Sequence, residues 1–238
     1  MEFLVDLHTH TISSGHAYST FDENVRFAKE HGIKLLGISD HAPSMPGGAH
    51  LYHFTNLRAV PKEVYGVRIL RGVELNIIDY SGTIDLSETT IRNLDYTIAS
   101  LHPPCIDFAD IKSVTYALLE TMQNPLVNII GHPGDQRYPQ NLYEITKMAK
   151  KTNTLLEVNN ASLSPDCLRV GVRESLIEML SHCNKLDLPI IANSDAHICY
   201  EVGDFTNTFT LLDAVEFPKD LILNLYPERV LDFLGIQD

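Results

Sequence analysis

Seven short apolar runs recur along the 238-residue chain, and most of them end in residues that can bind a metal ion. Apolar runs of this length, bounded by polar residues, predict buried strands. The first run ends in His8 and His10, which lie two positions apart, so the period-2 geometry of a strand directs both imidazoles to the same side. The runs with their polar ends are FLVDLHTHT (3–11), KLLGISDH (34–41), ILRGVE (69–74), YTIASLH (96–102), VNIIGH (127–132), LLEVNN (155–160) and IIANSDAH (190–197).

Helical segments alternate with these predicted strands. Thr20 and Glu23 predict a capping box at the start of a helix that Gly32 ends. Residues 42–56 are expected to form a long loop, because they are rich in proline and glycine. Further helices are expected near residue 87 and at 110–122, 141–151, 173–186, 208–215, 219–225 and 227–235.

The alternation of strands and helices predicts an α/β fold with a parallel sheet. Potential ligands at the carboxyl ends of successive strands favour a closed barrel over an open sheet, since catalytic residues gather at that rim of a barrel. Seven units in place of eight predict a distorted TIM-like (β/α)7 barrel, with residues 1–238 forming a single domain.

The composition excludes several classes of protein. A net charge of -13, from 31 acidic and 18 basic residues, disfavours binding to duplex nucleic acid or to an anionic membrane. The net charge does not exclude phosphate substrates, because bound divalent cations would add positive charge where such a substrate binds. The four cysteines form no CxxC pair, so a reducing compartment fits best. Without a signal-peptide pattern or an apolar run of membrane-spanning length, we expect a cytoplasmic protein.

The candidate ligands carry nitrogen and oxygen but no sulfur, which suits zinc, iron or manganese. Their number exceeds what one four-coordinate site can use, and this surplus indicates a cluster of metal ions. Glu74 is the natural bridging carboxylate, able to hold two metals roughly 3.5 to 4 Å apart, a spacing suited to phosphoester cleavage. The candidates are His8, His10, His16, His41, Glu74, His102, His132, Asp195 and His197.

The motifs DLHTHT, GISDHA, GVELN, ASLHPP, IGHPGD, LEVNN and NSDAH resemble, in this order, those of the polymerase and histidinol phosphatase (PHP) superfamily. The resemblance covers nearly the whole chain and is closest to the small stand-alone bacterial phosphatases. It implies a distorted seven-stranded barrel with three divalent metal ions, zinc being the first choice and manganese or iron the alternatives. The implied ligands are His8, His10, Glu74 and Asp195 for the first metal; Glu74, His102 and His132 for the second; and His16, His41 and His197 for the third.

The same resemblance implies hydrolysis of a small phosphomonoester, with a metal-bridging hydroxide as nucleophile and with Glu74 and Asp195 at the reaction centre. The third metal and a nearby arginine would bind the phosphate oxygens. Arg58 aligns with a phosphate-contact position in similar proteins, and Arg137 follows His132 closely. A solvated surface charge is an equal alternative for both arginines.

Other polar residues are expected to support the site. Asp6 and Asp40 precede ligands and are predicted to hydrogen-bond an imidazole, although either residue can simply terminate a strand. His50 and His53 lie in the predicted long loop, where they can touch substrate or be solvated.

Three other functions stay open from the sequence. A nuclease or phosphodiesterase acting on short oligonucleotides would use the same centre, but no basic groove is evident. An amidohydrolase-type enzyme commonly uses a lysine-bridged metal pair, and no lysine ends a predicted rim strand. A non-catalytic metal-binding protein is the third. The expected partner is a small phosphorylated substrate, and a homo-oligomer such as a trimer is left open.

Overall fold

Nine strands form two sheets in the computed structural model, which describes residues 2–237. The strand order is β1-β2-β4-β3 in the first sheet and β5-β6-β7-β8-β9 in the second. Every neighbouring pair is parallel except β3 and β4. The strands are β1 (Val5–Asp6), β2 (Leu35–Ile38), β3 (Glu63–Val64), β4 (Val67–Arg71), β5 (Glu74–Asn76), β6 (Ile98–Ser100), β7 (Ile129–Ile130), β8 (Leu155–Asn159) and β9 (Ile190–Asn193).

The predicted strand at 69–74 is divided between the two sheets. It ends as β4 at Arg71 and resumes as β5 at Glu74. Gly72 lies at this break, and a Cβ atom there would come within 2.4 Å of the Tyr96 ring. The sequence analysis also missed β3, which forms a hairpin with β4 through Tyr65 and Gly66, both with positive φ. The prediction of one uninterrupted strand at 69–74 is therefore wrong, and the Tyr96 ring leaves no room for a side chain at Gly72.

The two sheets approach each other at two places. An isolated parallel bridge joins His41 to Glu74, and a second joins Thr9 to Ala196. The parallel α/β architecture predicted from the sequence is confirmed, but its hydrogen-bonded ladders are interrupted at these two seams.

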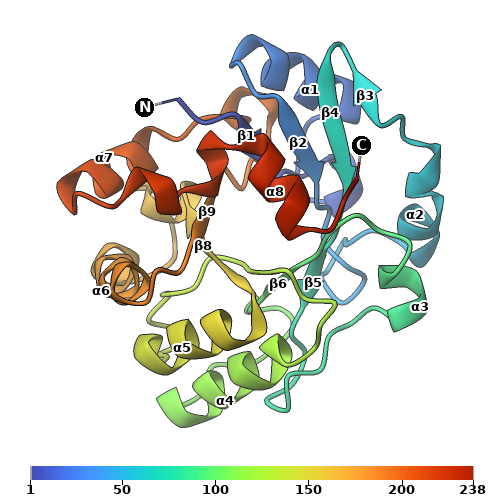
Figure 1. Ribbon diagram of the computed structural model, residues 1–238. Coiled ribbons are helices and arrows are strands. Elements are labelled where there is room, and N and C mark those ends of the chain that lie inside the picture. Colours follow the sequence, from blue (N-terminus) through green and yellow to red (C-terminus); the bar gives the residue numbers. More distant parts are fainter. Residues whose placement is uncertain (1, 238) are drawn as a thin grey trace.

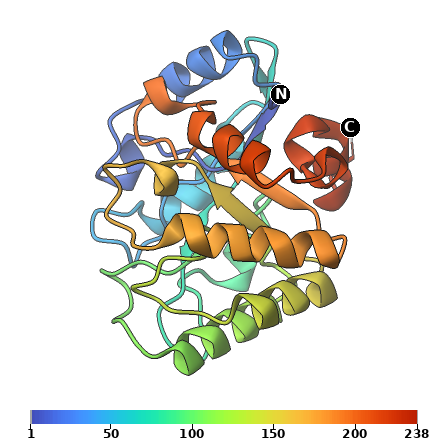
Figure 2. The same ribbon diagram turned by 90° about the vertical axis from the view of Figure 1, so that its left-hand side faces the viewer.

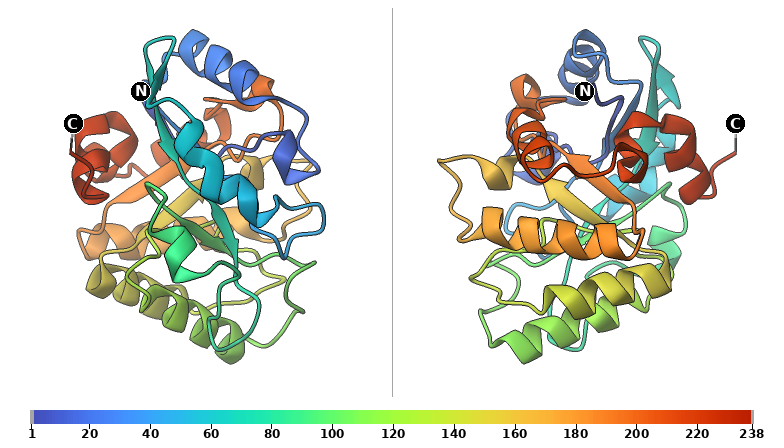
Figure 3. Two further views of the ribbon diagram at one scale, coloured as in Figure 1. Left: turned by 90° about the vertical axis from the view of Figure 1, so that its right-hand side faces the viewer. Right: turned by 60° about the vertical axis from the view of Figure 1, so that its left-hand side comes forward.

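Eight helices lie around the strands in the described part of the chain (Figure 1). The long helices α4, α5 and α6 lie side by side on one flank (Figure 2), and α1 lies near the short hairpin (Figure 3). No helix of residues 2–237 is long and apolar enough to cross a membrane. The helices are α1 (Phe21–Glu30), α2 (Leu51–Asn56), α3 (Glu88–Ile91), α4 (Ile111–Met122), α5 (Leu142–Thr152), α6 (Val172–Lys185), α7 (Thr206–Ala214) and α8 (Pro227–Phe233).

Short 3₁₀ turns replace parts of the predicted pattern. The helix expected at 219–225 is two separate turns, because Ile222 between them is extended and bridges to Ile190 of β9. The predicted loop at 42–56 contains α2, which the His50 side chain caps at the Tyr52 amide. The 3₁₀ turns are η1 (Ile12–Ser14), η2 (Leu57–Ala59), η3 (Ala161–Leu163), η4 (Cys199–Glu201), η5 (Lys219–Leu221) and η6 (Leu223–Leu225).

A second apolar cluster lies among the strands, separate from the core beneath the helices. Most parallel strands contribute one residue to it, and Val230 of α8 covers its end. Two positions after the cluster member on several of these strands, the side chain on the same face of the strand is that of a glycine, serine, asparagine or glutamate. The cluster therefore supports a polar layer at the carboxyl ends of the strands. Its strand members are Val5, Leu35, Leu70, Ile98, Ile129, Leu155 and Ile191.

Candidate metal centre

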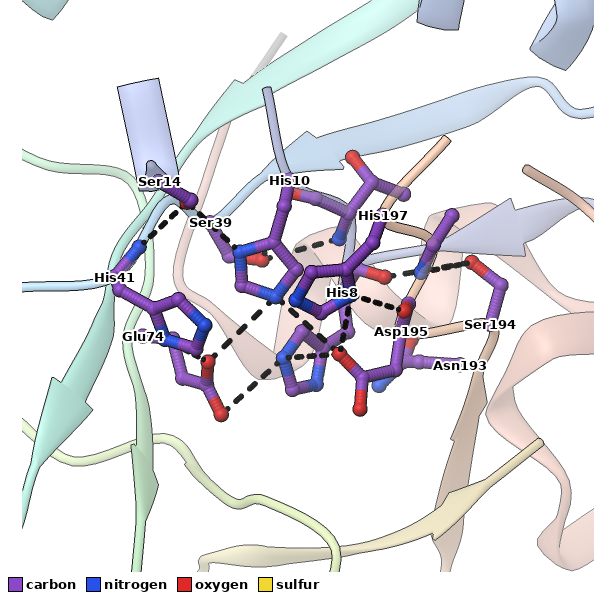
Figure 4. Close-up of polar contacts among 12 residues, drawn as sticks. His8, His10, Ser14, Ser39, His41, Glu74, Asn193, Ser194, Asp195 and His197 are labelled. Carbon is purple, nitrogen blue, oxygen red and sulfur yellow. Dashed lines mark hydrogen bonds and ion pairs between the residues drawn. The ribbon is translucent and has the colours of Figure 1, made fainter. Parts of the chain in front are cut away.

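His8 and His10 follow β1 and are fully buried at the centre of the polar layer (Figure 4). The Nε2 atom of His8 lies 3.3 Å from Glu74 Oε1 and 3.4 Å from Asp195 Oδ1. The Nε2 atom of His10 lies 3.6 Å from Glu74 Oε2 and 3.3 Å from Asp195 Oδ1. The fold thus brings these four predicted ligands together from both ends of the chain.

Glu74 is the hub of the cluster. Its carboxylate is fully buried and lies 2.7 Å from His41 Nδ1, 3.1 Å from His102 Nε2 and 2.9 Å from His132 Nε2. A carboxylate in contact with ligands on several sides has the arrangement expected of a group shared between metal ions.

His16 and His197 lie on the open side of the cluster. Their Nε2 atoms are 3.1 Å apart, and the His16 ring stacks on His41 with centroids 4.9 Å apart. His16 is exposed and the His197 side chain is 28% exposed, in contrast to the buried histidines behind them. All nine predicted ligands therefore gather in one place, and this side can be reached from outside.

The donor atoms fit metal ions because many of them lack other partners. Among the described residues, five buried atoms of the cluster have no suitably oriented hydrogen-bond partner: His8 Nε2, His10 Nε2, both ring nitrogens of His41, and Glu74 Oε2. An unsatisfied buried polar atom costs about 1 to 3 kcal/mol, so a fold that keeps several together requires a compensating ligand. Three groups have ligand atoms within 4.8 Å of one another: His8, His10 and Glu74; His41, Glu74 and His102; and His10, His41 and His197.

The charges in the cluster shift one another's pKa values. Burial alone would raise the pKa of Glu74, but His102, His8 and His41 lower it well below the usual value. Burial likewise opposes ionisation of Asp195, yet His8, His10 and Arg169 keep its pKa low. The pKa of His10 is lowered well below normal by burial and by His41 and His197. These shifts favour ionised carboxylates and, at His10, a neutral ring, which are the forms that bind metal.

The pKa of His8 is shifted in the opposite direction to that of His10. Burial lowers its pKa, but the carboxylates of Glu157, Glu74 and Asp195 together raise that pKa well above the normal value. The carboxylates thus outweigh the effect of burial on the pKa of this ring.

Side chains that the sequence analysis missed orient the ligand rings. Glu157 Oε1 lies 2.7 Å from His8 Nδ1, and Asn76 Oδ1 lies 2.8 Å from His102 Nδ1. Such contacts set which ring nitrogen faces a metal. The available signal was weak: Glu157 is a charged residue inside an apolar run, and Asn76 ends the GVELN motif.

The two predicted supporting aspartates have different surroundings. Asp40 accepts hydrogen bonds from Thr11 and Ser14, and it lies 3.1 Å from Nε2 of His53. Its imidazole partner is thus a histidine of α2 and not a predicted ligand. Asp6 accepts from backbone amides that include Ser194 and Gly203, so its observed partners are main-chain groups and not an imidazole.

Two predicted ligands have strained backbones. His132 has φ 28° and Asp195 has φ 59°, in the left-handed region that non-glycine residues rarely occupy. Such conformations persist where the surrounding structure enforces them, commonly at functional sites.

The arginines proposed from the sequence do not reach the cluster. Arg58 is exposed and lines a different cavity, and Arg137 is paired with Asp135, with 2.7 Å between Nη2 and Oδ2. Arg169, which the sequence analysis did not select, donates from Nη1 to Ser162 Oγ at 2.8 Å and to Asp195 Oδ2 at 3.3 Å. Arg169 lies in the irregular loop before α6, so no helix or strand periodicity in the sequence indicates where its side chain points.

A cavity of about 650 Å³ opens above the cluster. One wall carries predicted ligands, including His16, His41, His102 and His197, and Arg169 contributes a cation. The loop between η3 and α6 and the segment around η4 form the remaining walls. The cavity gives a small molecule access to the exposed side of the cluster.

Comparison with known families agrees with this geometry. The profile of the PHP domain matches residues 6–163, more than half of the chain. The chain belongs to the PHP family. A second profile, described as PHP-associated, matches residues 180–225, which include Asp195 and His197. The family inferred from the motifs is thereby confirmed.

Relatives of this PHP-family chain are named as phosphatases. A probable phosphatase of Clostridium novyi is 42% identical over 98% of this chain and 95% of its own length. A probable phosphatase of Photobacterium profundum is 42% identical over 98% of this chain and 94% of its own length. These names agree with the enzyme class predicted from the sequence.

Two solved structures share the fold. Histidinol phosphate phosphatase from Lactococcus lactis, in complex with zinc, L-histidinol and phosphate, has a TM-score of 0.61 at 17% identity and covers 92% of this chain and 95% of its own. An archaeal ribonuclease P structure with mature tRNA has a chain with a TM-score of 0.60 at 14% identity, covering 97% of this chain and 90% of that one.

Proposed function

We propose that this PHP-family protein is a phosphatase that hydrolyses a small phosphomonoester with the help of three divalent metal ions, zinc being the first choice and manganese or iron the alternatives. The observation that carries the proposal is the group of buried, unpaired nitrogen and carboxylate atoms at the floor of a 650 Å³ cavity. The names of the relatives and the zinc in the Lactococcus lactis structure support it.

The metal ligands are assigned as the motifs imply. The contacts of Glu74 with five of the histidines support its role as a shared ligand. The proposed sets are His8, His10, Glu74 and Asp195 for the first metal; Glu74, His102 and His132 for the second; and His16, His41 and His197 for the third.

Divalent metals at such a site act as Lewis acids and lower the pKa of bound water from 15.7 toward about 7. The chain supplies the rest. Glu74 and Asp195 place negative charge within the cluster, and buried neighbours keep bulk water from its inner side. His16 and His197 leave the outer side open to the cavity, where the phosphate group of a substrate would bind.

Arg169 replaces Arg58 as our candidate for phosphate binding. Its guanidinium lines the cavity, is 19% exposed and has one carboxylate partner at 3.3 Å, Asp195. Five N–H donors allow a guanidinium to keep its contacts with Ser162 and Asp195 while it donates to a phosphate oxygen.

We also propose that the strands form one closed, distorted (β/α)7 barrel in a single domain of residues 1–238. The bridges at His41–Glu74 and Thr9–Ala196 support closure. The apolar cluster that joins Val5 to Val230 supports one domain, since it spans both regions matched by the family profiles.

The test is hydrolysis of a panel of phosphomonoesters by protein loaded with zinc or manganese, with metal content measured in parallel. We expect hydrolysis that a chelator abolishes and that Glu74→Gln reduces at least about 10³-fold, because this change removes the shared carboxylate. Glu144→Gln, on the surface of α5, serves as the matched control. Metal-loaded protein that cleaves none of the esters, or that cleaves short oligonucleotides faster, would show the proposal to be wrong.

A further inference from the structure

Glu157 is a fully buried carboxylate in the middle of β8, on the side of the cluster away from the cavity. We propose that Glu157 is a positioning residue that fixes His8 and His132 and so determines whether the first two metal sites can fill. This inference rests on the proposed metal-dependent function for its consequence, but the contacts that it describes belong to the chain itself.

Both oxygens of Glu157 are fully used. Oε1 accepts from His8 Nδ1 at 2.7 Å and from Asn193 Nδ2 at 2.8 Å. Oε2 accepts from the backbone amide of His132 at 2.6 Å and from Asn159 Nδ2 at 3.0 Å. Four donors match the four acceptor positions of an ionised carboxylate. Two of these four donors belong directly to predicted metal ligands.

The surrounding amides cannot turn their oxygen atoms toward Glu157 without losing other bonds. Asn193 Oδ1 accepts from the backbone amide of Leu7 at 2.8 Å, which directs its NH₂ group toward Glu157. Asn159 Oδ1 accepts from the amide of Ser162 at 2.8 Å, with the same effect. The pocket for this side chain therefore presents donors only.

The contact with His8 determines which ring nitrogen faces the cluster. An ionised carboxylate cannot donate a hydrogen bond, so His8 Nδ1 must carry the proton in that contact. In the neutral ring, Nε2 then has its lone pair free, and it points between Glu74 and Asp195. Glu157 thus selects the tautomer of His8 that can bind a metal.

The contact with His132 acts on the backbone. His132 has a strained φ of 28°, and its amide donates the shortest of the four hydrogen bonds, at 2.6 Å. Through Asn159, which also donates to Asp195 Oδ2 at 3.1 Å, the same carboxylate is linked to a third predicted ligand. One side chain therefore connects ligands from three different strand ends.

The substitution Glu157→Gln separates this role from simple filling of space. The glutamine amide has one oxygen and one NH₂ group, and its volume is nearly the same as that of the carboxylate. The backbone amide of His132 cannot become an acceptor, so we expect the glutamine oxygen to remain there. The NH₂ group then faces both His8 Nδ1 and the NH₂ group of Asn193. Of these two only the His8 nitrogen can become an acceptor, so the His8 proton moves to Nε2, where it points into the cluster.

Two measurements test the proposal. The first is zinc affinity by competition with a chromogenic chelator: we expect Glu157→Gln to bind its tightest zinc about 10- to 100-fold more weakly than wild type. The second is the NMR signal of the His8 Nδ1 proton under conditions in which the ring is neutral, that is, with zinc bound or in metal-free protein titrated to high pH: we expect the signal in wild type and expect it to be lost in Glu157→Gln. Asp95→Asn is the matched control, because Asp95 is a hydrogen-bonded carboxylate that pairs with Arg71 outside the cluster.

The outcomes distinguish this inference from the proposed function. Wild-type zinc affinity together with an unchanged Nδ1 proton in folded Glu157→Gln overturns the role of Glu157, whatever the enzyme hydrolyses. If Glu157→Gln does not fold, wild type alone decides: a His8 Nδ1 without a proton overturns the proposal, and a proton there supports it. Wild-type protein that takes up no metal contradicts the proposed function, and the NMR comparison still decides the contact.

Discussion

Replacing Asn224 with leucine should destabilise the protein strongly. Asn224 is fully buried in η6, next to the seam between β1 and β9. Its side chain accepts from Ala192 N at 2.7 Å and donates to Ala192 O at 2.6 Å and Val5 O at 2.8 Å. One amide group thus takes the place of a neighbouring strand at an edge of β9.

The expected magnitude follows from these three hydrogen bonds. Leucine has a similar volume, so it leaves little room for a water molecule to replace the amide, and three buried backbone groups lose a partner. Each such group costs about 1 to 3 kcal/mol, and burying leucine in place of a polar amide returns part of this cost. We therefore expect Asn224→Leu to lower the free energy of unfolding by about 4 kcal/mol, or the melting temperature by about 8 to 16 °C.

Urea unfolding of metal-free protein is the assay, because bound metal would add a binding term to the apparent stability. Asn184→Leu, at an exposed position of α6, is the matched control and should change the free energy of unfolding by less than about 0.5 kcal/mol. If Asn224→Leu loses less than about 1 kcal/mol, the reasoning that its amide secures the seam is wrong.

Three further predictions concern the site. In steady-state assays, Arg169→Met should lower kcat/KM for a phosphomonoester about 10²-fold, since it removes a donor that faces the cavity. Arg137→Met and Arg58→Met should have little effect, and equal losses in all three variants would contradict this assignment. Removing metal with a chelator should lower the melting temperature by about 5 to 11 °C, relative to protein in a free metal concentration 100 times the dissociation constant. An unchanged melting temperature would contradict metal binding by the folded state. Burial lowers the pKa of His10 and of His102, whereas the carboxylates around His8 raise the pKa of that ring. Because a histidine must be deprotonated to bind metal, metal content after dialysis should fall as the pH is lowered through these pKa values, and metal content that stays constant from about pH 8 down to about pH 4 would contradict the ligand assignment.

The regular part of the fold could be predicted because it depends on local patterns. The capping box at Thr20 and Glu23 forms as expected, with the Glu23 carboxylate accepting from the Thr20 amide at 2.7 Å. The third strand could not be predicted in full, since its division depends on distant partners: β4 pairs with β2, whereas β5 pairs with β6. The segment at 219–225 failed for a similar reason: Ile222 pairs with Ile190, and a contact so distant in sequence overrides helical spacing.

Part of the site could also be predicted. The histidines, Glu74 and Asp195 converge as expected, because the ends of parallel strands meet at one edge. Arg169 could not be found, since it reaches Asp195 from an irregular loop. Glu157 was overlooked within an apolar run, where its partners are distant in sequence.

The sequence by itself determined the candidate ligands, the alternation of strands and helices, and the family, because ligand chemistry and hydrophobic periodicity are properties of neighbouring residues. Only the tertiary structure decided which nitrogen of His8 faces the cluster, which arginine lines the cavity, and how Asn224 secures the seam between β1 and β9. Those choices depend on hydrogen bonds between side chains and backbone groups far apart in the sequence, and no local pattern encodes the distance between them.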